Sequence, residues 1–251
     1  MSPARTAMHF ALLVLCATLC GCSERELPPL ADIMLRDVPD MPQQGPVFDA
    51  RYENDTLCGP VAVSNSLAWL KGGTTEAQQI ELVNYLAHYR YMGTRPTVGT
   101  NPLGLMHGLE KYLAEQALPY ASVSYAGVRD LPEKYLASAP FSIQWLHARL
   151  AAQSAIWLNL GWYSQWIPGI YEREGGHWVT LVGFRNGRLV IHDPGPWQEL
   201  IEPLPMKLRE NSIIYEQQWK LAPLIAELED FPSPRGGRTF IDGAVVLELD
   251  N

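Results

Sequence analysis

The stretch NDTLCGPVAVSNSL, residues 54–67, predicts a short turn followed by a helix, with Cys58 where the helix begins. Pro60 has a φ already fixed near the helical value and no N–H group, so it suits a first helical turn. Apolar residues then recur at helical spacing, at Val63, Leu67 and Leu70. The pattern therefore predicts a helix with an apolar stripe and a cysteine at its start.

The position of Cys58 has a chemical consequence. Free backbone N–H groups and the positive end of the helix dipole converge at a helix N-terminus, and both favour thiolate over thiol. The same N–H groups can hold a developing oxyanion. A free cysteine is also among the most buried residue types, so inert packing is the alternative interpretation.

A histidine and an acid occur much later in the chain. His177 lies in the strand-like segment GGHWVTLVGF, residues 175–184, and Asp193 lies in LVIHDPG, residues 189–195. A cysteine with a distant histidine and a carboxylate or amide is typical of thiol hydrolases.

Three short motifs carry a resemblance to a known family. They are CGP at 58–60, GHWV at 176–179 and IHDP at 191–194, and in this order they resemble the papain-like cysteine peptidases, in particular their C39-like branch. The resemblance covers roughly residues 50 to 200.

The resemblance implies a role for each matching residue. Cys58 would be the nucleophile, His177 the general base and acid, and Asp193 the group that orients the imidazole. The family usually also has a glutamine a few residues before the cysteine, whose amide completes the oxyanion hole. None stands there in this chain, and Asn54 is the candidate for an equivalent amide.

The register of the last two motifs raises a question. Asn186-Gly187 predicts a hairpin turn, and an ideal two-residue loop would place Asp193 opposite Thr180. Successive side chains alternate between faces, so Asp193 would then lie on the face away from His177. A β-bulge or a longer loop must intervene for the two to meet. Otherwise His192 is the alternative partner.

The start of the chain resembles a bacterial lipoprotein signal. A short positive region precedes an apolar run, Phe10 to Leu19, that is too short to span a membrane stably. LCGC at 19–22 then predicts cleavage before Cys22 and lipid on its thiol. We therefore expect an exported protein anchored in the bacterial cell envelope, at the outer membrane if the host has one.

This prediction divides the chain into three segments. Residues 1–21 are expected to be the signal peptide, 22–48 a lipidated, proline-rich tether, and 49–251 a C39-like papain-fold domain. Of the four cysteines, Cys58 then is the only free thiol, and in an exported protein an unpaired cysteine favours a reactive role.

The charge balance and the motifs of the chain exclude several classes of binding partner. The chain has 27 Asp and Glu against 19 Lys and Arg, and no basic cluster, which argues against nucleic acid and against binding an anionic membrane by charge. It has no H-E-x-x-H pattern, no Cys-x-x-Cys pair and no phosphate or dinucleotide motif, so we expect no metal and no cofactor.

The order of elements predicts an α+β fold. Helices are expected at 76–89, 102–116 and 141–152, and strands at 122–125, 155–160, 177–184, 188–193, 212–219 and 240–249. Residues 163–169 read as a loop between two of these strands. The papain-like fold has this layout, with N-terminal helices that carry the nucleophile packed on a C-terminal antiparallel sheet.

These observations predict a membrane-anchored thiol hydrolase, above all a cysteine peptidase with a peptide or protein substrate. An acyl transferase or amidase with the same three residues is one alternative. Another is a catalytically inactive papain-like domain that serves as a peptide-binding or assembly lipoprotein.

Overall fold

The computed structural model describes residues 24–25, 29–195, 204–215, 219–233 and 236–250. The predicted signal peptide and the predicted lipidation site at Cys22 lie outside these residues. Within the described part, no helix is both long enough and apolar enough to cross a membrane.

The chain forms two compact units. Unit 1 consists of residues 1–28, 161–175 and 205–241, and unit 2 consists of residues 29–160, 176–204 and 242–251. The segment 49–251, predicted as one domain, is thus shared between the two. Cys58, His177 and Asp193 all belong to unit 2.

Unit 2 contains the helices of the described chain: α2 (Cys58–Leu70), α3 (Glu76–Ala87), α4 (Pro102–Glu115), α5 (Ile143–Ala151) and the short 3-10 helices η1 (Asn54–Thr56) and η2 (Glu133–Tyr135). Their starts follow from local sequence. Thr75 and Gln78 form a capping box at α3, and the side chains of Asn101 and Ser142 accept backbone N–H groups at the starts of α4 and α5.

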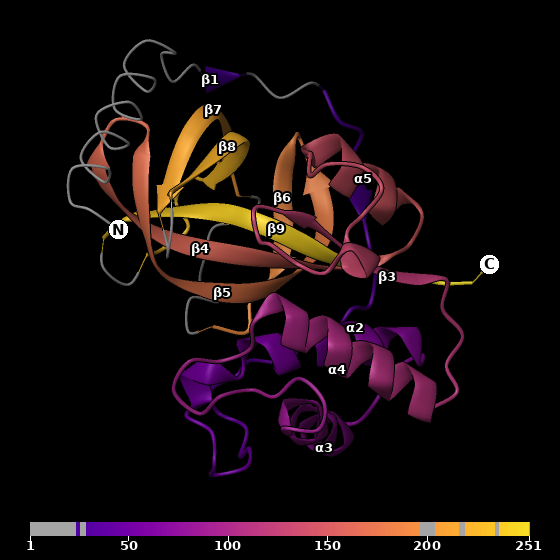
Figure 1. Ribbon diagram of the computed structural model, residues 1–251. Coiled ribbons are helices and arrows are strands. Elements are labelled where there is room, and N and C mark those ends of the chain that lie inside the picture. Colours follow the sequence, from indigo (N-terminus) through magenta and orange to yellow (C-terminus); the bar gives the residue numbers. More distant parts are fainter. Residues whose placement is uncertain (1–23, 26–28, 196–203, 216–218, 234–235, 251) are drawn as a thin grey trace. The chain divides into compact units, whose positions relative to one another are not determined.

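The strands of unit 2 pair antiparallel. They are β2 (Ile33–Met34), β3 (Ser122–Gly127), β6 (Arg188–His192) and the unit 2 parts of β4 (Ala155–Ile167), β5 (Ile170–Arg185) and β9 (Arg238–Glu248). β5 pairs with both β2 and β6, and β3 pairs with β9. In Figure 1, α2, α3 and α4 gather on one side of these strands. The predicted combination of helices with an antiparallel sheet is confirmed.

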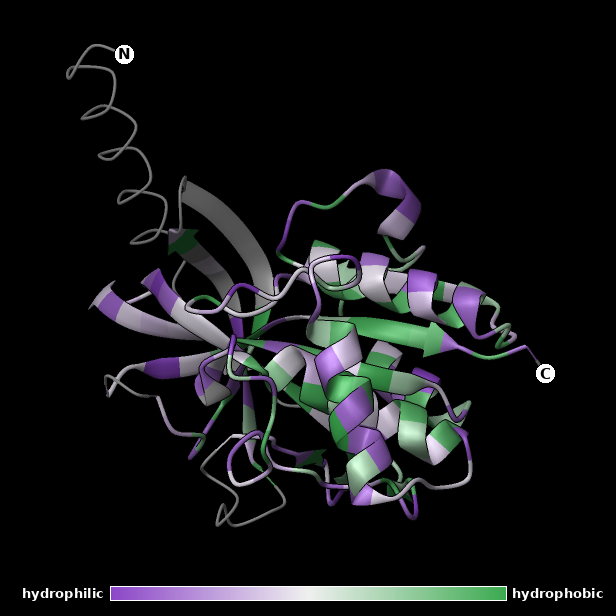
Figure 2. Ribbon diagram, turned by 90° about the horizontal axis from the view of Figure 1, so that it is seen from below, coloured by the Kyte–Doolittle hydropathy of each residue, from purple (hydrophilic) through white to green (hydrophobic). Residues whose placement is uncertain are grey.

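Helix α2 lies at the centre of the unit 2 core. Every residue from Cys58 to Ala68 is buried, so the helix is enclosed on all sides and not only along the predicted stripe. The Nε1 of Trp157 and the hydroxyl of Thr180 both donate to the carbonyl of Ala62, which ties the middle of α2 to β4 and β5. Figure 2 shows hydrophobic strands behind helices that carry hydrophilic residues as well. The core therefore fixes the start of α2, where Cys58 lies.

The segment predicted as a tether belongs to unit 2 from residue 29 onward, and its apolar residues join the core from Leu35 onward. β2 extends the sheet beside β5, and Leu35, Val38, Met41 and Phe48 are buried. The backbone N–H of Met41 donates to the side chain of Asn65 on α2. The apolar residues between the prolines thus hold residues 35–48 against unit 2.

Unit 1 contains β1 (Glu24–Arg25), β7 (Met206–Tyr215), β8 (Trp219–Leu228) and the remaining parts of β4, β5 and β9. β7 pairs antiparallel with β8 and parallel with the first residues of β5. The carboxylate of Glu227, only 6% exposed, is held by Arg209 and Arg238.

Two sequence-based assignments in unit 1 were wrong. The strand expected at 212–219 straddles the end of β7 and the start of β8, because two apolar runs on either side of a short polar run were joined into one. The loop expected at 163–169 is mostly strand, since β4 continues to Ile167 and β5 begins at Ile170. Its aromatic residues suit a strand as well as a loop.

Candidate active site

Cys58 is the first residue of α2. No side chain caps this helix, and the first helical bond runs from the N–H of Val61 to the carbonyl of Leu57. The N–H groups of the residues before Val61 therefore have no acceptor within the helix. Cys58 is 6% exposed and has no disulfide partner. The predicted placement of a free thiol at a helix N-terminus agrees with the structure.

His177 and Asp193 contact each other directly. The Nε2 of His177 lies 2.5 Å from Oδ1 of Asp193, and the two residues are 3% and 6% exposed. The same Oδ1 accepts the backbone N–H of Gly195 at 2.7 Å, which fixes the carboxylate. Since Nε2 is engaged by Asp193, the other ring nitrogen of His177 is the one left for Cys58, which is close enough to raise the pKa of the imidazole.

A β-bulge makes this contact possible. β5 and β6 follow the ideal hairpin register from Arg185 and Arg188 down to Gly183, but the next pair is Leu181 with Ile191. The extra residue, Val182, shifts the register so that Thr180 pairs with His192 instead of Asp193. Asp193 and His177 consequently share a face, as the sequence analysis required of a bulge.

His192 occupies a different environment. Its Nδ1 lies 3.0 Å from the carbonyl of Pro39, and it pairs with Thr180 on the other face of the strand. The structure thus brings Asp193, and not the alternative His192, to His177.

The surroundings of His177 favour its charged form. Burial alone would lower the pKa of this imidazole, but the negative charge of Asp193, its hydrogen bond and the contact with Cys58 together raise the pKa from 6.5 to about 10. An imidazolium between a carboxylate and a thiol is the arrangement that stabilises a thiolate.

This shift predicts how stability depends on pH. The pKa of His177 in the folded protein lies above that of the unfolded chain, so protonated His177 contributes its full stability below about pH 6.5. That contribution is lost as the pH rises through about 10. Urea unfolding of the wild type and of His177→Gln at pH 6 and pH 10 should therefore show a stability difference that shrinks at the higher pH. A difference that stays constant or grows would contradict the assigned charge state.

The predicted amide donor Asn54 begins η1, but the structure describes only its backbone. The structure instead shows a different amide side chain, that of Gln43, near Asp193 in the chain's fold. Gln43 is 2% exposed, and its backbone N–H donates to the carbonyl of Pro194, next to Asp193, at 2.7 Å. Its Oε1 is buried without a hydrogen-bond partner in the described part of the chain. Two residues earlier, Met41 packs with Leu57 and Val61, so this segment passes between the start of α2 and the end of β6.

Sequence reasoning missed Gln43 because the search for an amide stopped a few residues before Cys58. Gln43 precedes the cysteine by 15 positions, inside the segment taken for a tether. No local pattern in the sequence marks Gln43, because only the folded chain brings it to Pro194 and α2.

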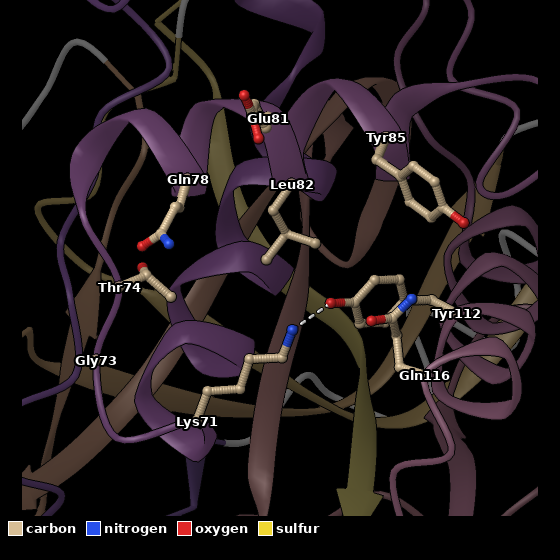
Figure 3. Close-up of a pocket in the computed structure, with 9 residues that line it drawn as sticks. All are labelled: Lys71, Gly73, Thr74, Gln78, Glu81, Leu82, Tyr85, Tyr112 and Gln116. Carbon is tan, nitrogen blue, oxygen red and sulfur yellow. Dashed lines mark hydrogen bonds between the residues drawn. The ribbon is translucent and has the colours of Figure 1, made fainter.

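A cavity of about 460 Å³ lies elsewhere in unit 2 (Figure 3). It is lined by Lys71, Gly73, Thr74, Gln78, Glu81, Leu82, Tyr85, Tyr112 and Gln116. Lys71, whose Nζ donates to the hydroxyl of Tyr112 at 2.6 Å, follows the last residue of α2. Cys58 lies at the opposite end of this helix, about 18 Å away along its axis. The cavity is therefore separate from the candidate active site.

Among the residues that the structure describes, no three His, Cys, Asp or Glu side chains are grouped to hold a metal ion.

The chain has a match among solved structures but none among protein-family models or curated proteins. No protein-family model matches the chain, and no curated protein matches it either. Among solved structures, the chain is similar to a crystal structure described as a "putative C39-like peptidase from Bacillus anthracis", with 15% sequence identity and a TM-score of 0.40. The match covers 65% of this chain and 83% of that chain. A likeness at this level does not by itself assign an activity.

Proposed function

We propose that this protein is a thiol hydrolase, and specifically a cysteine peptidase, in which Cys58, His177 and Asp193 act together. The observation that carries the proposal is the buried His177 imidazole, bonded to Asp193 at 2.5 Å and close enough to Cys58 for its pKa to be raised by that residue. The position of Cys58 at the start of α2 adds free N–H groups and a favourable dipole.

The proposed reaction proceeds in two stages. In the resting pair His177 already holds the proton of Cys58, and the thiolate attacks the carbonyl carbon of a peptide bond. The intermediate collapses as His177 returns the proton to the leaving amine, which yields a thioester on Cys58. A water molecule, deprotonated by His177, then attacks the thioester and releases the acid. Asp193 keeps the imidazole oriented and stabilises its positive charge throughout.

The negative charge on the attacked oxygen needs donors. We assign this role to the backbone N–H of Cys58 and to the side-chain amide of Gln43, in place of Asn54. The support for Gln43 is its burial between α2 and Pro194, with no partner for its Oε1 in the described residues. The oxyanion role requires the NH2 group of this amide, and the oxygen and nitrogen of an amide are exchanged by a simple flip.

Peptide hydrolysis tests the proposal directly. Incubating the full chain with a proteome-derived peptide mixture should produce new peptide ends, detectable by mass spectrometry, and Cys58→Ala should produce none. Acid quenching of the wild type should also trap an acyl group on Cys58. Transfer of that acyl group to an added amine in preference to water would instead assign the site to an acyl transferase. Tight peptide binding without any cleavage would favour the inactive, peptide-binding alternative.

We also propose export and anchoring through a lipid on Cys22, on the sequence of residues 1–22 alone. In a bacterial host supplied with an alkyne analogue of palmitate, the wild-type protein should be labelled and recovered with the membranes. Cys22→Ala should lose the label, while Cys58→Ala should keep it. Equal labelling of both variants would contradict the assigned lipidation site.

A further inference from the structure

A segment next to the candidate nucleophile lacks acidic residues. Residues 82–109 contain no aspartate or glutamate, although the chain has 27 of them. The same segment carries Arg90 and Arg95, which are both exposed. Within the described residues neither arginine forms an ion pair with a carboxylate, and the guanidinium of Arg90 donates to the hydroxyl of Tyr89. The carboxylate of Glu115, outside the segment, accepts from the hydroxyls of Tyr85 and Tyr91, but within the segment itself the full charges are all positive, in a protein with a net charge of −8.

Backbone contacts place this segment against the start of α2. A Cβ at Gly59 would come within 3.0 Å of the Cβ of Thr100, and one at Gly99 within 3.4 Å of the carbonyl of Thr56. The carbonyl of Thr100 also accepts the Nε1–H of Trp178, the residue after His177, at 2.8 Å. Gly99 and Thr100 therefore lie against the residues next to Cys58, and Thr100 also bonds to the residue next to His177.

The exposed part of the segment is held close to these anchors. Arg95 and Gly99 exchange two backbone hydrogen bonds, and the hydroxyls of Thr94 and Thr100 lie 2.7 Å apart. Arg95 and Gly99 thus close a tight turn. Gly99, at the far side of this turn, packs against Thr56.

Large apolar side chains are exposed in the same place. Tyr89 is 71% exposed, Val98 63% and Leu103 41%. Leu103 belongs to the first turn of α4, which packs so closely on Met92 that a Cβ at Gly104 would come within 2.4 Å of the Met92 carbonyl. Exposed apolar side chains and two exposed arginines thus occur in the same segment, and we call the set Tyr89, Arg90, Arg95, Val98 and Leu103 the acid-free surface.

We propose that the acid-free surface binds the substrate chain beside the scissile bond and selects peptides in which an acidic side chain stands near an apolar one. The inference rests on the proposed function, because it assumes that Cys58 attacks the bound chain. Charge complementarity identifies the occupant: guanidinium groups without a carboxylate partner in the described residues bind carboxylates, and the exposed aromatic and aliphatic groups bury apolar side chains. Glu53, just before η1, and Asp55, on η1, are the exposed carboxylates that precede Cys58, and Asp55 already accepts from the amide of Gln44 at 2.8 Å.

Covalent probes test the selectivity separately from the chemistry. We would use acetylated tetrapeptide chloromethyl ketones that contain leucine and either glutamate or glutamine, with the glutamate position scanned. The rate of adduct formation on Cys58 is measured by intact mass and divided by the rate with iodoacetamide. At one position the glutamate probe should react roughly fivefold faster than its glutamine counterpart. Arg95→Gln or Arg90→Gln should reduce this ratio, and the double variant should bring it to about one.

Matched controls make the result specific. Arg188→Gln, at the exposed β5–β6 turn, removes the same charge elsewhere on unit 2 and should leave the ratio unchanged. Glu53→Gln should not lower it. Equal rates for both probes at every position, or a preference that survives the double variant, would overturn the inference.

Failure of the proposed function has a different signature. If Cys58 does not react with iodoacetamide or the ketones, the same peptides without the ketone are tested for equilibrium binding to the Cys58→Ser chain by fluorescence anisotropy. Tighter binding of the glutamate peptide, lost in the double arginine variant, would uphold the acid-free surface as a peptide-binding site without catalysis. No difference between the two peptides would overturn it.

Discussion

Replacing His177 by alanine should reduce peptide hydrolysis by about 10⁴-fold or more. The thiol of Cys58 would lose its only described base, and the leaving amine would lose its acid. Asp193→Asn should cost less, about 10²- to 10⁴-fold, because the imidazole stays in place without its charged partner. Initial rates on a cleaved peptide, with far-UV circular dichroism to verify folding, measure both effects.

His192 provides the matched control. It is on the neighbouring strand and adjoins Asp193 in sequence, but its imidazole contacts the carbonyl of Pro39. His192→Ala should therefore keep activity within several-fold of the wild type. If His192→Ala were as damaging as His177→Ala, or if His177→Ala kept most of its activity, the assignment of the base would be wrong.

The second large effect is expected at Gln43. Gln43→Ala should lower kcat by about 10²- to 10³-fold with little change in KM, because an oxyanion donor acts in the transition state and not in substrate binding. Iodoacetamide alkylation of Cys58 should be unchanged, since this reaction forms no oxyanion. The neighbouring Gln44→Ala, which removes an exposed amide bonded to Asp55, should have little effect.

The same measurements separate two roles for Gln43. Its backbone bonds to Pro194, next to Asp193, so the second possible role is that its side chain holds Asp193 in place. In that case Gln43→Ala would alter the pH profile of Cys58 alkylation in the same way as Asp193→Ala. Such a change would contradict the oxyanion assignment.

Local signals in the sequence were sufficient for most of unit 2. The start of α2 and the capping box at Thr75 depend on a few adjacent residues, and both are present in the structure. The contact between His177 and Asp193 was a harder case. The turn at Asn186-Gly187 alone predicted the wrong face for Asp193, and the position of the bulge at Val182 depends on how β5 pairs with both its neighbours. At Gly183, for example, a Cβ would come within 2.8 Å of the Ile33 carbonyl of β2.

Other features depended on contacts that no local pattern encodes. Gln43 is far from Cys58 in sequence, and only the packing of Met41 on α2 and the bond to Pro194 bring it to the site. In unit 1, β7 and β8 are separated by a few polar residues that are too short a signal to divide one strand from two. Short apolar runs of this kind are ambiguous by periodicity alone.

The pH profile of Cys58 alkylation by iodoacetamide tests the central claim most directly, on the full chain and on His177→Ala and Asp193→Ala. The account predicts that the wild type reacts well below pH 8 and that removal of His177 shifts the reaction to the range of an ordinary thiol, near pH 8.5. Asp193→Ala should give an intermediate profile. An unreactive Cys58, or the profile of an ordinary thiol in all three proteins, would contradict the thiolate–imidazolium pair and with it the proposed hydrolase.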